Sequence, residues 1–155
     1  MATANNTANF LPVDGSWVLE QHPFAASTAI KDGYAVGIEI SGNNVTGYLT
    51  LMGVENASGA DFFGIMAEPI AATDTDYATA GKLKNVWVPT TPLAKAKFKV
   101  SAGTFTAADV YKTVQIGASS DGLDVDTAGK GARIVQHISS TEGICTFSLP
   151  TTETA

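Results

Sequence analysis

The residues of this chain best suited to chemistry are two histidines, one cysteine and a few aspartates. His22 and His137 lie far apart in the sequence, and neither belongs to an HxxxH or other metal-ligand spacing. The chain has no GxSxG nucleophile motif and no GxxxxGK[ST] phosphate loop. Gly129–Ile134 (GKGARI) lacks the spacing of such a loop. We therefore expect no enzyme activity and no cofactor, and we interpret both histidines as structural or surface residues.

The cysteine and the aspartates give the same indication. Cys145 is the only cysteine and lies in the apolar run GICTFSL, which predicts a buried and unreactive thiol. Asp121, Asp124 and Asp126 carry the oxygen ligands that calcium prefers, but their spacing is not that of an EF-hand loop. The single arginine, Arg133, argues against a nucleotide hydrolase, which needs several arginines for phosphate groups. We expect no metal site.

The segments that hold these residues are short, apolar and separated by turn-forming residues, which is typical of β-strands. Thr106 and Asp109 have the spacing of a capping box and predict one helical turn. The sequence shows no internal repeat. We predict a mostly β, single-domain fold of the β-tulip, barrel or sandwich type. The eight or so expected strands are 35–40, 45–54, 62–70, 82–89, 95–101, 113–116, 132–138 and 144–149.

The first 29 residues differ from the rest of the chain. Their apolar side chains are interrupted by prolines and a glycine, which fits neither a regular helix nor a regular strand. We predict an extended N-terminal arm over residues 1–29 that clamps a neighbouring subunit; packing on its own domain is the alternative. The β domain then spans 30–149 and a flexible tail 150–155. The arm's candidate interface residues are Phe10, Leu11, Trp17 and Phe24.

Charge is distributed unevenly along the chain, whose net charge is −6. Residues 1–80 carry nine acidic side chains and one lysine, whereas residues 81–112 carry six lysines and one aspartate. Lys95, Lys97 and Lys99 alternate with apolar residues and therefore share one face of a strand. These lysines are a candidate interface for an acidic partner surface; a solvated strand face is the alternative. The net negative charge argues against nucleic acid.

The start of the chain has no charged region followed by an apolar run, and no apolar segment approaches 18 residues. We therefore expect a protein that folds in a cytoplasm and has no membrane partner.

Several short motifs in the second half of the chain follow one another in a recognisable order. They are Val86–Pro89 (VWVP), Thr106–Val110 (TAADV), Lys112–Val114 (KTV), Asp121–Asp126 (DGLDVD) and Gly131–Val135 (GARIV). This order, over 81–149, resembles the capsid decoration (cement) proteins of tailed bacteriophages. The motifs are strand and turn signals and carry no chemistry. The arm and the hairpin expected from strands 35–40 and 45–54 match these proteins less well.

The resemblance implies a β-tulip or barrel-like fold and a homotrimer on the outer capsid surface. It also implies an N-terminal arm that contacts the major capsid protein, and a structural role in the virion after assembly in the host cytoplasm. Two other functions remain open. One is another virion part, such as a tail-tube, head-fibre or spike subunit. The other is a carbohydrate-binding β module with an aromatic platform made of Trp17, Trp87, Tyr48 and Tyr77.

Overall fold

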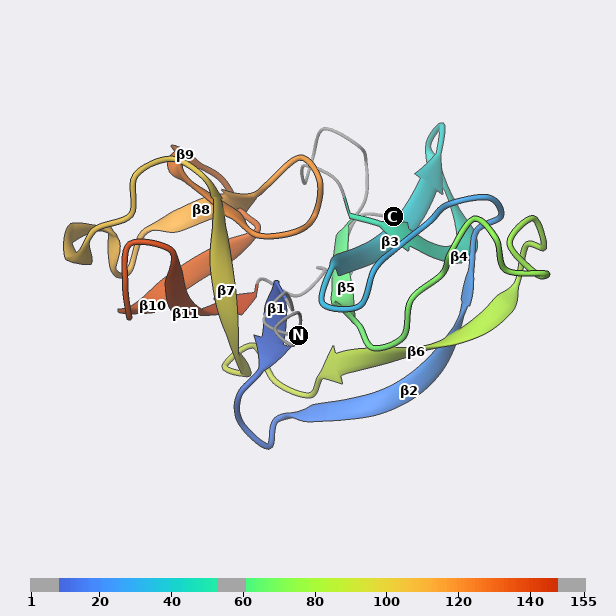
Figure 1. Cartoon of the computed structure of the whole chain (residues 1–155), viewed down its shortest axis with the longest axis horizontal. Helices are drawn as coiled ribbons and strands as arrows, with labels where there is room; N and C mark the ends of the chain where they lie inside the picture. The colour runs from blue at the N-terminus through green and yellow to red at the C-terminus, as the bar shows by residue number, and fades with distance from the viewer. Residues whose placement is uncertain (1–8, 53–60, 148–155) are drawn as a thin grey trace.

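The protein folds as two small β-barrels that lie side by side (Figure 1). The computed structural model describes residues 9–52 and 61–147. The predicted tail, 150–155, and residues 1–8 of the predicted arm lie outside these ranges. The mostly β fold class is confirmed. The described part contains no helix long and apolar enough to cross a membrane.

The first barrel is a closed ring of five strands in the order β2-β4-β3-β5-β6. β2 pairs with β4 in parallel, and each of the other neighbouring pairs is antiparallel. β2 and β6 form a long curved ribbon along the lower side of the molecule in Figure 1. The strands of this barrel are β2 (Trp17–Phe24), β3 (Ala35–Ser41), β4 (Asn44–Leu51), β5 (Asp61–Met66) and β6 (Lys82–Pro89).

The second barrel contains the C-terminal strands, together with a strand from the start of the chain. Its sheet has the order β1-β7-β11-β10-β8-β9, and a parallel pairing of β7 with β9 closes five of these strands into a ring. β1 (Phe10–Pro12) lies outside the ring and pairs with β7. The ring strands are β7 (Lys95–Ala102), β8 (Thr113–Ile116), β9 (Leu123–Ala128), β10 (Ala132–His137) and β11 (Glu142–Phe147).

The two barrels have the same strand connectivity. If the five strands of each barrel are numbered in chain order, the order around the ring is 1-3-2-4-5, and strand 5 pairs back with strand 1. In both barrels, strands 1 and 3 are the parallel pair. β2 to β6 therefore correspond one by one to β7 to β11. What repeats is the order in which the strands pair. The sequence showed no repeat because strand pairing depends on residues far apart in the chain.

A shared hydrophobic core makes the two barrels one domain. The ring of Phe62, from β5, stacks on that of Phe147, from β11, with centroids 4.0 Å apart. The indole N–H of Trp17 donates a hydrogen bond of 2.9 Å to the carbonyl oxygen of Lys95, at the start of β7. One continuous buried cluster includes residues of both barrels. Because burial of apolar area is the main stabilising term, we expect each barrel to depend on the other.

The expected extended arm is wrong for the described residues 9–29. β1 and β2 are integral strands: β1 pairs with β7, and β2 pairs with β6 along its whole length. The side chain of Phe10 is buried in the shared core, so this segment packs on its own domain. The prolines are tolerated because Pro12 lies in the strand outside the ring and Pro23 near the end of β2, where few pairing donors are needed.

The eight expected strands are present, with different ends, as β3 to β8, β10 and β11; β5, for example, ends at Met66. The expected ends at 53–54 and 148–149 lie outside the described residues. The capping box at Thr106 is confirmed and begins η2 (Ala107–Asp109), one turn of 3-10 helix. The expected number was too low because β1, β2 and β9 were not predicted. β9 follows directly after the turn at Gly122, and three acidic or polar residues interrupt its apolar pattern.

Candidate interaction faces

The three lysines of β7 lie on its outer side. Ala96 and Phe98 are buried in the shared core, while Lys95 is exposed and Lys97 and Lys99 are partly exposed. This confirms the alternation expected from the sequence, because successive side chains of a strand point to opposite faces.

Neighbouring strands extend this outer surface. Leu11 of β1 and Ile144 of β11 flank Lys97 in register, and Glu142 lies opposite Lys99. Leu11 is 44% exposed. The ammonium of Lys97 lies 3.7 Å from the carboxylate of Glu142, a weak pair at a partly exposed position. We call the outward side of β1 and β7, formed by Leu11, Lys95, Lys97 and Lys99, the lysine face.

The other three candidates from the predicted arm are not surface residues. Phe10 and Trp17 are buried in the core shared by the barrels, and Phe24 is buried in a second cluster inside the first barrel. These aromatic side chains hold the domain together and offer no exposed area to a partner. Of the four apolar interface candidates, only Leu11 is exposed.

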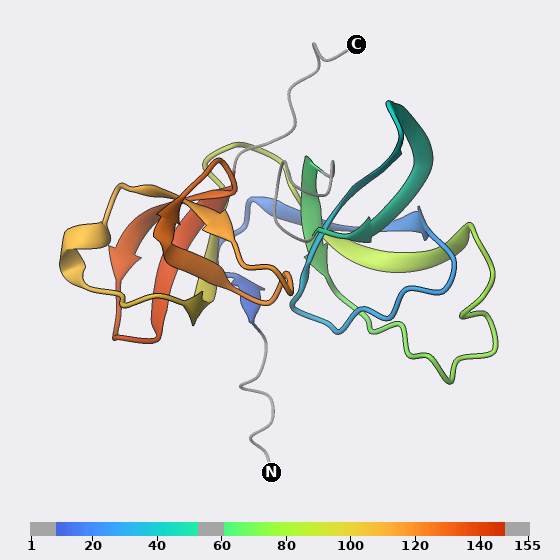
Figure 2. The same cartoon turned by 90° about the horizontal axis from the view of Figure 1, so that it is seen from above.

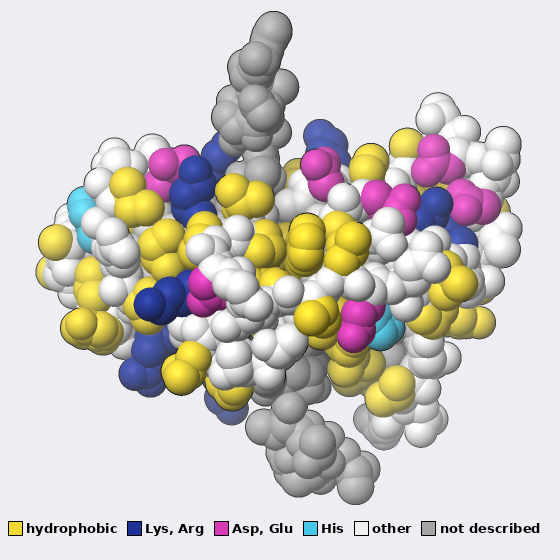
Figure 3. Space-filling view, turned by 90° about the horizontal axis from the view of Figure 1, so that it is seen from below, with side chains coloured by type: hydrophobic (Ala, Val, Ile, Leu, Met, Phe, Trp, Pro, Cys, Tyr) yellow, Lys and Arg dark blue, Asp and Glu magenta, His cyan; other side chains and the backbone are white. Residues whose placement is uncertain are grey.

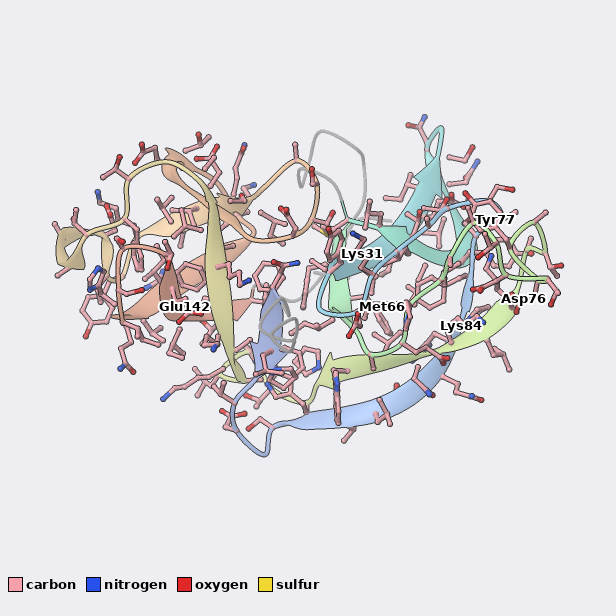
Figure 4. The ribbon with its side chains drawn as sticks, viewed as in Figure 1. Lys31, Met66, Asp76, Tyr77, Lys84 and Glu142 are labelled. Carbon is pink, nitrogen blue, oxygen red and sulfur yellow. The ribbon has the colours of Figure 1, made fainter. Side chains whose placement is uncertain are left out.

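The remaining lysines of 81–112 do not belong to one basic patch. Lys82 is buried, and its ammonium donates hydrogen bonds to the carbonyl oxygens of Ala25 at 2.8 Å, Tyr77 at 3.1 Å and Thr79 at 3.2 Å. The ammonium of Lys84 lies 3.2 Å from Asp76. Figure 4 shows Asp76, Tyr77 and Lys84 together at the far end of the first barrel, away from Glu142.

Lys112 is also paired, with its ammonium 2.8 Å from the carboxylate of Asp109. This hydrogen bond, together with one from the backbone N–H of Thr106, lowers the pKa of Asp109 below its usual value. The same bond raises the pKa of Lys112. The carboxylate of Asp109 also closes the capping box of η2, so the ion pair with Lys112 supports a structural role.

Further exposed apolar side chains lie next to the lysine face and along β2. Val13 follows β1, with its N–H bonded to the carbonyl oxygen of Lys95, and Leu93 precedes β7 and is 74% exposed. Val18 and Leu19 are also exposed, but they are adjacent on β2 and point to opposite sides of it. Figure 3 shows hydrophobic side chains over the middle of the lower side of the molecule, with both basic and acidic side chains around them. One edge of β2 pairs with β6 along the whole strand. Within the described residues, its other edge pairs with β4 only at Phe24. Exposed apolar groups beside an incompletely paired strand are typical of a surface that binds protein.

A second open feature lies at the start of β8. A groove of about 610 Å³ is lined by Tyr111, Lys112, Val114, Asp126, Ala128 and Arg133. Tyr111 is 72% exposed and adopts a φ of 77°, which is uncommon for a residue with a side chain. Sequence reasoning did not find this groove. No local sequence pattern reports it, because the exposure of Tyr111 depends on how β8, β9 and β10 pack.

The histidines and the cysteine lie in separate environments. His22 contacts the ring of Phe63 edge-on and its Nε2 lies 2.8 Å from the carboxylate of Glu20. His137 packs against Phe105 on the other barrel. Cys145 is buried on β11, and burial raises the pKa of its thiol far above the usual value, which keeps it protonated.

The aspartates considered for calcium bind local groups of the protein. Asp124 accepts hydrogen bonds from the N–H of Asp126 at 3.2 Å and from the hydroxyl of Thr127 at 2.9 Å. Asp126 accepts one from the N–H of Thr104 at 3.2 Å. Among the described residues, no three metal-ligating side chains gather at one place.

The four aromatic residues proposed for carbohydrate binding do not form an open platform. Trp17 is buried, Trp87 packs against the shared core, and Tyr77 packs inside the first barrel. Tyr48 is partly buried on β4. Stacking on a sugar requires an accessible ring face, which the buried Trp17 does not offer.

No protein-family model matches the chain, and no curated protein is similar to it in sequence.

Proposed function

We propose that this chain is a structural virion protein that binds the outer surface of a phage capsid and stabilises the lattice of the major capsid protein. The observation that carries the proposal is the lysine face, where Leu11, Lys95, Lys97 and Lys99 share the outward side of two neighbouring strands. The resemblance of residues 81–149 to capsid decoration proteins supplies the partner.

The lysine face and the apolar residues beside it would bind a partner surface of complementary charge and shape. A partner surface with carboxylates would meet the lysines, and exposed apolar residues such as Val13 and Leu93 would become buried beside them. Charge attraction steers association and fixes register, while apolar burial supplies most of the affinity. Short side chains around such a face lose little conformational entropy on binding.

The test is co-sedimentation of the purified protein with empty shells of the major capsid protein. We expect binding at a fixed ratio, weakened about ten-fold or more when Lys95, Lys97 and Lys99 are all replaced by Glu. For a matched comparison, Lys95→Glu on the face should weaken binding, whereas Lys31→Glu should not. Lys31 is also exposed and lies before β3 on the first barrel.

Two results would contradict this proposal. Equal binding by the Lys95→Glu and Lys31→Glu variants would mean that the lysines form an ordinary solvated strand face. Failure of the unaltered protein to pellet with shells would remove the capsid as its partner.

A further inference from the structure

The contact between the two barrels uses a hairpin turn. The turn between β8 and β9 lies against the start of β3, where the N–H of Ala35 donates a hydrogen bond of 2.9 Å to the carbonyl oxygen of Ser120. Ser120 is fully buried. Thus the turn between the second and third strands of the second barrel contacts the start of β3, which is the second strand of the first barrel.

The corresponding position on the second barrel is open. The start of β8 corresponds to the start of β3, and the pairing of Val114 with Ala128 corresponds to that of Val36 with Leu51. In the second barrel this position borders the groove at Tyr111. No other part of the described chain fills that groove.

The corresponding turn on the first barrel projects without a partner in the described chain. The hairpin of β3 and β4 rises away from the body of the molecule (Figures 1 and 2). Val45, beside its turn, is 65% exposed. The sequence around the turn, Ser41–Asn44, has short or amide side chains that suit insertion into a groove.

The hairpin and the groove also have complementary chemistry. Glu39 lies on the hairpin, on the face opposite Val45, because it accepts a hydrogen bond of 2.8 Å from the hydroxyl of Thr46, the neighbour of Val45. A hairpin that enters the groove would therefore present Val45 to one wall and Glu39 to the other. Arg133 lines the groove and makes no ion pair with another described residue. Tyr111 and Ala128 supply apolar area for Val45. Asp126 also lines the groove, but its carboxylate accepts the hydrogen bond from Thr104.

We propose that the β3–β4 hairpin of one copy of this chain inserts into the β8 groove of a second copy. The contact would repeat between chains the hairpin-to-strand contact that joins the barrels within one chain. Its two sides are different surfaces, so the association is head-to-tail and closes into a ring or continues, according to the rotation between copies. This contact would produce the self-association expected of the proposed virion protein, and it can be tested without capsid shells.

The first experiment measures mass in solution by light scattering over a range of concentrations. The unaltered chain, of 16.0 kDa, is expected to associate into multiples of that mass, with one fixed multiple if the ring closes and a mass that grows with concentration if it does not. Val45→Asp and Arg133→Glu should each raise the concentration needed for association about ten-fold or more. Leu83→Asp is the matched control, because Leu83 is 57% exposed on β6, outside both surfaces, and should associate normally.

A mixture of variants tests the head-to-tail geometry. Val45→Asp copies keep an intact groove, and Arg133→Glu copies keep an intact hairpin, so the mixture should form heterodimers that cannot extend. Each variant alone should be monomeric under the same conditions. The charge reversal Glu39→Arg combined with Arg133→Glu should recover part of the association lost in either single variant.

The inference is overturned if the unaltered chain stays monomeric at all concentrations. It is also overturned if Val45→Asp associates as well as Leu83→Asp, or if the mixture forms no heterodimer. A monomer that still pellets with shells would retain the proposed function and reject the hairpin contact. A multimer that does not pellet with shells would support the hairpin contact and reject the proposed function.

Discussion

Lys82 shows how the surroundings of a residue decide its role. In the sequence it is one of six lysines in a basic stretch, yet its ammonium is buried and bonded to three backbone carbonyls. These bonds fix the loop before β6 to the end of β2. Neighbouring residues in the chain do not reveal this role, because the carbonyl of Ala25 comes from a distant segment.

The pair of Asp109 and Lys112 makes a pH-dependent contribution that can be measured. The pKa of Asp109 is lowered in the folded protein, so its contribution to stability is present above the usual value of 3.8 and is lost as the pH falls through the lowered value. We expect Asp109→Asn to be less stable than the unaltered protein at pH 6, with a smaller difference near pH 3. Urea unfolding at both values measures the difference.

Asn at position 109 retains a side-chain oxygen for the N–H of Thr106, so the variant removes the charge and keeps the cap. A stability difference that stays constant down to pH 3 would contradict the role assigned to the carboxylate.

At the scale of elements, the sequence predicts strands well where alternation is local. β7 and β8 begin at the expected residues, and two pairs of consecutive expected strands, β3–β4 and β10–β11, form antiparallel hairpins. The predictions failed where a strand's environment changes along its length. β2 is buried at Trp17 and Phe24 but exposed between them, so it has no simple alternation.

β1 provides a direct test of its assignment as a strand. Phe10 is buried and Leu11 points outward, although they are adjacent. We expect Phe10→Ala to lower the free energy of unfolding by about 3–5 kcal/mol, because it leaves a cavity in the shared core. Leu11→Ala should cost less than about 1 kcal/mol. Denaturant unfolding followed by circular dichroism measures both changes, and equal effects would mean that residues 10–12 are not held as a strand.

The candidate surfaces were predictable to different degrees. Period-two alternation was enough to place Lys95, Lys97 and Lys99 on one face. The β8 groove was not predictable, since it forms where β8, β9 and β10 meet and since Arg133 reaches it only through the pairing of β10 with β8. The parallel pairings that close each barrel join strands separated by another strand, and no local pattern reports them.

At the scale of the whole molecule, the shared core predicts one cooperative unfolding transition. Both tryptophans lie on strands of the first barrel and Cys145 on a strand of the second, and Trp17 also contacts Phe147, so fluorescence and thiol labelling both report on the shared core, from residues of different barrels. Tryptophan fluorescence and thiol labelling should give the same urea midpoint. Phe62→Ala, which removes the stack on Phe147, should lower both midpoints together. Two separate midpoints would mean that the barrels fold independently.

The course of the chain through the two barrels has a consequence for its synthesis on the ribosome. β1 is made first, but its pairing partner β7 follows only after the entire first barrel has been made. Phe10, Trp17 and Phe62 therefore emerge before Phe147, the residue that covers them, which belongs to the last strand. The nascent chain must carry this apolar surface uncovered through most of translation, and its folding is completed only when β11 has left the exit tunnel.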